Sequence, residues 1–109
     1  MPSFEGTWNT TRYRTAAPDA PEQIVLTIAS DTTAGSLDGH YARSGQDARM
    51  FGSLDGTGYV WSASVDETGS TGDIGQAVFF LSTDGNTIHG AWTSAQSGAG
   101  PQPWFGSRV

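Results

Sequence analysis

Four aromatic side chains recur beside glycines or small residues, at spacings that place ring and small residue on one face of a strand. They are Trp8, Tyr41, Trp61 and Trp92. In Gly6-Thr-Trp8, for example, alternate residues of an extended chain point to the same side, and the glycine leaves room for a neighbouring ring. Rings gathered on one face can stack against a flat ligand, and they can equally fill the core of a small barrel. The pattern therefore predicts either ligand-contacting walls or core packing.

Arg43 follows Tyr41 at strand spacing and so shares its face. Its guanidinium could hold a carboxylate or phosphate at the rim of a site through a forked hydrogen bond, although an exposed arginine at a strand end is the alternative interpretation. By the same alternation His40 and His89 fall on the opposite, outer face. Outward histidines are poorly placed for acid–base catalysis inside a lumen.

Residues 66–73 hold three acids, Asp66, Glu67 and Asp73, and raise the question of a calcium site. Their spacing does not match a helix–loop–helix calcium loop, so we expect an acidic hairpin loop there. No serine lies in a nucleophile-elbow pattern. The sequence predicts no metal site and no cofactor.

The composition limits the classes of partner. The 109 residues form one predicted domain, 1–109, with a net charge of −6 in which all five cations are arginines. So few cations argue against binding to nucleic acid or to an anionic membrane surface. The opening residues lack the basic and apolar regions of a signal peptide, which favours a cytoplasmic location.

Apolar residues recur two apart through most of the chain, as in Ile24, Leu26 and Ile28, and this is the spacing of a strand. Short turn-rich segments separate eight such stretches, which favours antiparallel neighbours. The predicted strands are residues 4–13, 22–29, 35–43, 49–55, 59–66, 75–82, 87–94 and 103–109. Rolling this meander into a barrel buries its apolar face and pairs both edges, so the expected fold is an all-β, eight-stranded antiparallel up-and-down β-barrel.

Three motifs resemble those of the avidin and streptavidin family, in the order in which that family carries them. They are Gly6-Thr7-Trp8, Leu37-Asp38-Gly39-His40-Tyr41 and Trp92-Thr93-Ser94. The resemblance implies a lipocalin-like eight-stranded barrel that holds a small ligand between aromatic rings at its open end, often within an oligomer.

The biotin-contacting positions of that family are not matched. Thr10 stands where the family has an asparagine, and Asn9 is one residue early, on the other face of its strand. Arg43 replaces the family's serine, and Ser107-Arg108 stand in the region where an aspartate is expected. A site whose buried polar groups lose their partners discriminates strongly, so we expect no tight binding of biotin.

Three classes of function fit the pattern. The first is a barrel that binds a flat or ring-containing hydrophobic small molecule, with ligand contacts from Trp8, Thr10, Tyr41, Arg43, Trp61 and Trp92. The second is a barrel-shaped cyclase or isomerase that acts by enclosing and orienting its substrate, and it predicts the same strands. The third, a lectin or protease-inhibitor module, would use the outer loops.

Within residues 76–81, Val78 and Phe80 lie opposite Ala77, Phe79 and Leu81, so both strand faces are apolar. This predicts a homo-oligomer, a dimer or a tetramer, that covers the outer side. The sequence GSLDG occurs twice, at residues 35–39 and 52–56. In both copies the leucine and the second glycine share one strand face, so we interpret the repeat as barrel construction and not as a duplicated site.

Overall fold

The computed structural model describes the chain except for residues 1–2, 15–16, 31–34, 44, 68–72 and 95–100. The side chains of residues 14, 17–20, 43, 46 and 73 are also outside the described part. The description therefore covers all eight strands and the turns at residues 55–59 and 82–86. The described residues include no helix long and apolar enough to cross a membrane.

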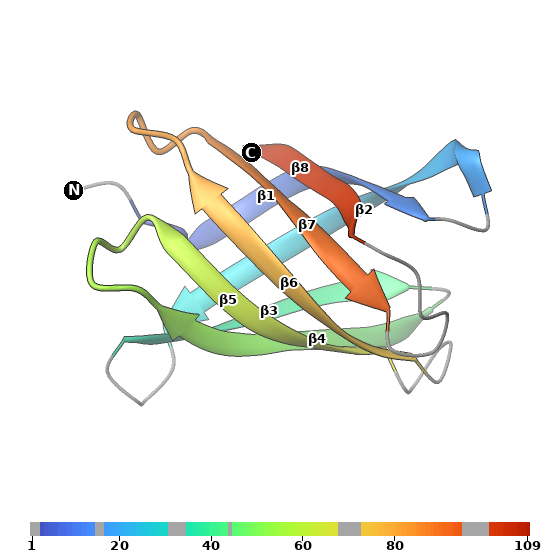
Figure 1. Cartoon of the computed structure of the whole chain (residues 1–109), viewed down its shortest axis with the longest axis horizontal. Coiled ribbons are helices and arrows are strands. Elements are labelled where there is room, and N and C mark those ends of the chain that lie inside the picture. The colour runs from blue at the N-terminus through green and yellow to red at the C-terminus, as the bar shows by residue number, and fades with distance from the viewer. Residues whose placement is uncertain (1–2, 15–16, 31–34, 44, 68–72, 95–100) are drawn as a thin grey trace.

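Eight antiparallel strands close into a barrel in which each strand pairs with its neighbours in sequence (Figure 1). They are β1 (Gly6–Arg14), β2 (Ala17–Ser30), β3 (Ser36–Arg43), β4 (Gln46–Leu54), β5 (Val60–Glu67), β6 (Asp73–Leu81), β7 (Thr87–Ser94) and β8 (Gln102–Arg108). β8 pairs with β1 from Trp8↔Arg108 to Arg12↔Trp104, so the sheet has no free edge. The predicted all-β up-and-down barrel is confirmed.

The largest extensions beyond the predicted bounds are at three strand starts, because β2 begins at Ala17, β4 at Gln46 and β6 at Asp73. Pro18 and Pro21 favour a turn in the sequence pattern, but β2 pairs with β1 as far as Arg14↔Ala17, across a register irregularity between Arg12 and Arg14. β5 continues to Glu67, so the first two acids of the stretch 66–73 lie in a strand and only residues 68–72 remain for the predicted loop, outside the described residues.

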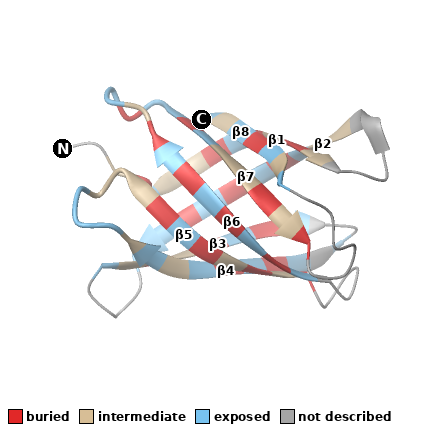
Figure 2. Ribbon diagram, viewed as in Figure 1, coloured by how far each residue is buried: buried red, intermediate tan, exposed pale blue. Residues whose placement is uncertain are grey.

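Side chains fill the middle of the lumen. Buried and exposed residues alternate along the strands (Figure 2). Inside, Trp61 stacks on Phe79 with ring centroids 6.2 Å apart, and Phe79 meets Trp104 edge-on at 5.1 Å. Trp61, Phe79 and Trp104 have no exposed surface, whereas a ring beside a water-sized void would keep some. The rings therefore pack against one another as a core.

One end of the barrel is closed by the segment before β1 and by Arg108. Phe4 is buried 6.1 Å from Trp61, and its carbonyl oxygen accepts a hydrogen bond from Trp8 Nε1 at 2.8 Å. The Arg108 guanidinium lies 4.3 Å from the Trp8 ring centre and donates to the carbonyl oxygens of Ser3, Glu5 and Gly85, at 2.5, 2.7 and 3.1 Å. We call this the Arg108 end.

Glycines inside strands allow close approach of two kinds. A Cβ on Gly39 would lie 3.1 Å from the Trp61 ring, so this glycine lets a ring lie across the backbone. A Cβ on Gly90 would lie 1.9 Å from the carbonyl oxygen of Val78, in the neighbouring strand β6. In this second case the obstacle is backbone, which cannot turn aside as a side chain can.

We expect Gly90→Ala to lower the free energy of unfolding by about 1–3 kcal/mol, the usual cost of overpacking. Gly56→Ala is the matched control, because nothing lies within 4 Å of the added Cβ and the backbone there is not left-handed. Urea unfolding of both variants measures the difference. Equal stability of the two variants would contradict the close β6–β7 contact.

Candidate functional site: the Arg12 end of the barrel

Arg12 lies inside the barrel, at the end opposite Arg108. It follows Trp8 and Thr10 on the inward face of β1 and is fully buried. This is the end at which β1 connects to β2, β3 to β4, β5 to β6 and β7 to β8. A buried charge is costly unless it is paired and hydrogen-bonded. The groups that contact Arg12 therefore determine the chemical character of this end of the barrel.

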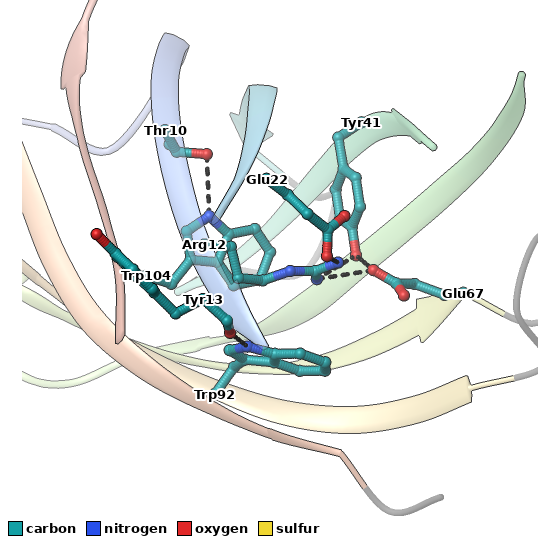
Figure 3. Close-up of polar contacts among 8 residues, drawn as sticks. All are labelled: Thr10, Arg12, Tyr13, Glu22, Tyr41, Glu67, Trp92 and Trp104. Carbon is teal, nitrogen blue, oxygen red and sulfur yellow. Dashed lines mark hydrogen bonds and ion pairs between the residues drawn. The ribbon is translucent and has the colours of Figure 1, made fainter. Parts of the chain in front are cut away.

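Two carboxylates and one phenol surround the guanidinium (Figure 3). Arg12 Nη1 forms an ion pair with Glu67 Oε2 at 2.7 Å and lies 3.2 Å from Tyr41 Oη. Arg12 Nη2 lies 3.5 Å from Glu22 Oε1, and the Tyr41 hydroxyl donates to Glu67. Glu67 is 1% exposed, whereas the Glu22 side chain keeps 24% of its surface.

Aromatic rings flank the same guanidinium. Its central carbon lies 4.3 Å from the ring centre of Trp92 and 4.8 Å from that of Trp104, with Tyr41 at 5.6 Å. Figure 3 shows the arginine side chain between the two indoles, with Tyr41 and the acids gathered at its tip. Contact between a guanidinium and indole faces is favourable, and more so away from water. We call Arg12, Tyr41, Glu67, Trp92 and Trp104 the Arg12 cluster.

Hydrogen bonds from the cluster to β1 and β2 fix the indoles. Trp104 Nε1 donates to Thr10 Oγ1 at 2.9 Å, and Thr10 Oγ1 donates to the carbonyl oxygen of Ile24 at 2.7 Å. Trp92 Nε1 donates to the carbonyl oxygen of Tyr13 at 3.0 Å. Both rings are therefore held in one orientation against Arg12.

One nitrogen of the Arg12 cluster lacks a hydrogen-bond partner in the described part of the chain. Arg12 Nε is buried and has no hydrogen-bond partner among the described residues, and the same holds for Trp61 Nε1 in the middle of the lumen. An unpaired donor on a charged group costs more than one on a neutral indole. Of these two unpaired donors, the one on Arg12 therefore costs more free energy.

Burial raises the pKa of the Tyr41 phenol well above its ordinary value of 10.0, with the nearby Glu67 carboxylate adding to the effect and Arg12 opposing it. The hydroxyl therefore stays protonated through the physiological range and acts as a donor to Glu67. Glu67 is the acceptor in this pair.

The six predicted ligand contacts are spread along the lumen. Tyr41 and Trp92 belong to the Arg12 cluster, and Thr10 accepts the hydrogen bond that orients Trp104, another member of the cluster. Trp61 is packed in the middle, and Trp8 lies under Arg108 at the opposite end. The Arg43 side chain is outside the described part. The structure thus brings Tyr41, Trp92 and Thr10 to one end of the barrel.

Other sequence-based expectations concern residues outside the lumen. Asn9, His40 and His89 are exposed on the outer face, as alternation predicts. The expectation for the acidic stretch is corrected at Glu67, which is a buried partner of Arg12 and not a solvated loop residue, because it continues the inward face of Trp61 and Val65. Among the described residues no group of three His, Asp or Glu side chains is arranged to hold a metal ion.

Arg12, Glu67 and Trp104 are the cluster members that the sequence analysis does not predict as site residues. A signal for Arg12 exists, since strand alternation from Trp8 through Thr10 reaches it on the inward face. A charged residue at an inward position of a barrel is a departure from the pattern and marks a site to examine.

Comparison with models of protein families gives no match to this chain, and comparison with curated proteins gives none either. The closed eight-stranded antiparallel barrel is consistent with a calycin-like fold. The closer likeness to avidins rests on the three sequence motifs alone.

Proposed function

We propose that this protein binds a small, flat, ring-containing molecule at the Arg12 end of its barrel. The observation that carries the proposal is the fully buried guanidinium of Arg12, flanked by indole rings, with Nε unpaired among the described residues. The rest of the lumen is filled almost entirely by apolar side chains, which could fill this end at lower cost. A charge retained where apolar packing would serve marks a candidate functional site.

The closure of the opposite end supports access from the Arg12 end. Phe4 and the three carbonyl contacts of Arg108 close the opposite end, and the packed rings of Trp61 and Phe79 fill the middle. A ligand that enters from the Arg12 end meets the Arg12 cluster, with the rings of Tyr41 and Trp92, before the packed middle of the lumen. Each is 3% exposed, so binding has to be coupled to an opening of this end, and we expect slow association.

Two features support a ligand other than biotin. The Thr10 hydroxyl already accepts from Trp104 and donates to Ile24, so no proton on it is free for a ureido oxygen. Asn9, the nearest amide in sequence, is exposed on the outer face. A ring with hydrogen-bond acceptors at its edge fits the indoles and the unpaired Arg12 nitrogen better.

A barrel-shaped cyclase or isomerase is the second candidate, and the Tyr41–Glu67 contact favours it. A protonated phenol and an adjoining carboxylate can act as an acid and a base when a substrate lies against both. Chromatography of a compound incubated with the protein separates the two candidates, because an enzyme converts the compound and a binder leaves it unchanged. No described contact favours a lectin or protease-inhibitor module.

We expect a panel of flat heteroaromatic compounds to include one that raises the thermal unfolding midpoint. A ligand at about 100 times its Kd stabilises the folded state by about 2.7 kcal/mol. Trp92→Phe removes the indole beside Arg12 and should raise the Kd of that compound at least about tenfold, a loss of roughly 1.4 kcal/mol of binding free energy. Phe51→Leu, on the outer face of β4, is the control and should leave the affinity unchanged. Equal affinity in both variants would place the ligand elsewhere.

A further inference from the structure

We propose that a second copy of this chain docks against the outer surface of β6, β7 and β8, in a two-fold dimer in which Phe80 of each copy enters a hollow on the other. We call this surface the β6–β8 face. Its outward residues are Ile74, Gln76, Val78 and Phe80 of β6, Thr87, His89, Ala91 and Thr93 of β7, and Pro103, Phe105 and Ser107 of β8. This inference is independent of the ligand proposed above.

The β6–β8 face lacks the charges found on other parts of the barrel. None of its outward residues is an aspartate, a glutamate or an arginine. The outer face of β3 and β4, in contrast, carries Asp38, Asp47 and Arg49, with Arg49 and Asp38 paired at 3.0 Å. Two copies of a chain with net charge −6 repel each other, and least where no carboxylate faces the partner. Charge therefore favours a second copy on this face over the outer face of β3 and β4.

Large apolar side chains project from the same face. Phe80 is 44% exposed and stacks on His89, which pairs with Phe105 in the next strand. Phe105 is 41% exposed and stacks on Tyr13 at 6.2 Å. Side chains of this kind, gathered across neighbouring strands, are typical of protein–protein contacts.

A hollow of about 160 Å³ lies beside these rings. Its lining is almost wholly apolar and comes from Gln76, Val78, Ala91, Trp92, Thr93 and Pro101. Val78 is two residues from Phe80 along β6, so a projecting ring and a hollow lie side by side on one surface. A space of about 150 Å³ accommodates a benzene ring. A two-fold axis between ring and hollow would place each Phe80 in the partner's hollow.

The available area suits a dimer of modest size. Strands of about eight residues span roughly 26 Å, and three neighbouring strands span roughly 14 Å across, from the usual rise and spacing. The projected area is thus on the order of 400 Å², before side-chain relief is added. Specific complexes bury about 800 Å² on each partner. The smaller area favours a weak dimer that forms at high protomer concentration over a permanent assembly.

Sedimentation equilibrium of the full chain up to about 100 μM tests the proposal, because dimerisation depends on protomer concentration. We expect a mass that rises toward twice 11.4 kDa. Phe80→Arg should weaken dimerisation at least about tenfold. Phe51→Arg is the matched control, since Phe51 is 45% exposed on β4, and it should dimerise as the wild type does.

A second variant, Ala91→Trp, fills the hollow from the solvent side without disturbing the core and should also weaken dimerisation. It keeps the test valid if Phe80→Arg does not fold, which circular dichroism would reveal. A wild-type chain that stays monomeric at every concentration overturns the proposal. So does a dimer that persists in both interface variants, because that dimer must use another surface.

Discussion

Replacement of Glu67 by leucine is expected to lower the free energy of unfolding by about 3–5 kcal/mol, the usual cost of leaving a buried charge without its partner. Glu67 is the partner that binds Arg12 at 2.7 Å, and both side chains are buried. Glu22, at 3.5 Å and partly exposed, cannot replace it fully. Chemical denaturation measures the loss.

The matched variant replaces Arg12, Tyr41 and Glu67 together, as Arg12→Met, Tyr41→Phe and Glu67→Leu. It removes the ion pair and its phenol as a unit, so it leaves none of the three with an unpaired polar group. A buried ion pair exchanged for apolar side chains of similar size is often neutral or stabilising. We expect the triple variant to be within about 1–2 kcal/mol of the wild type. A triple variant as unstable as Glu67→Leu alone would mean that the cluster is needed for folding.

Arg108→Met is the second change with a large expected effect, a loss of about 2–3 kcal/mol. Three charge-assisted hydrogen bonds to carbonyl oxygens disappear, and the Trp8 ring loses its cover. Binding of a compound at the opposite end should be unchanged. Trp8 also becomes accessible, which a red shift of tryptophan fluorescence and stronger quenching by acrylamide would report.

Arg49→Met is the control for Arg108→Met. Arg49 also makes an ion pair, with Asp38, but both groups are in contact with solvent, and such pairs contribute at most about 1 kcal/mol. An Arg108 variant no less stable than the Arg49 variant would contradict the view that Arg108 closes its end of the barrel.

The barrel could be predicted from the sequence because its determinants are local. Alternation two residues apart, as in Ile24, Leu26 and Ile28, marks inward faces, and the short turns leave few ways to connect eight strands. Boundaries were less predictable. Pro18 and Pro21 favour a turn, yet pairing with β1 as far as Arg14↔Ala17 holds this segment in the sheet. Tertiary pairing thus overrides local propensity.

The Arg12 cluster could be predicted only in part. The aromatic members Tyr41 and Trp92 follow from ring spacing, but Trp104 is not among the predicted site residues. Arg12 and Glu67 are not predicted either, because charged residues are rarely buried without a partner. Strand alternation can place Arg12 inward. It cannot supply Glu67, which belongs to a distant strand and reaches Arg12 only when the barrel closes.

Native mass spectrometry tests most directly whether the Arg12 cluster is a ligand site. The wild type and the triple variant are exposed to the same extract of small molecules from the source cells and desalted without denaturation. We expect the wild type to retain a ring-containing compound and the folded triple variant to retain none. Retention of the same compound by both proteins, or by neither, would contradict the claim that the Arg12 cluster binds a ligand.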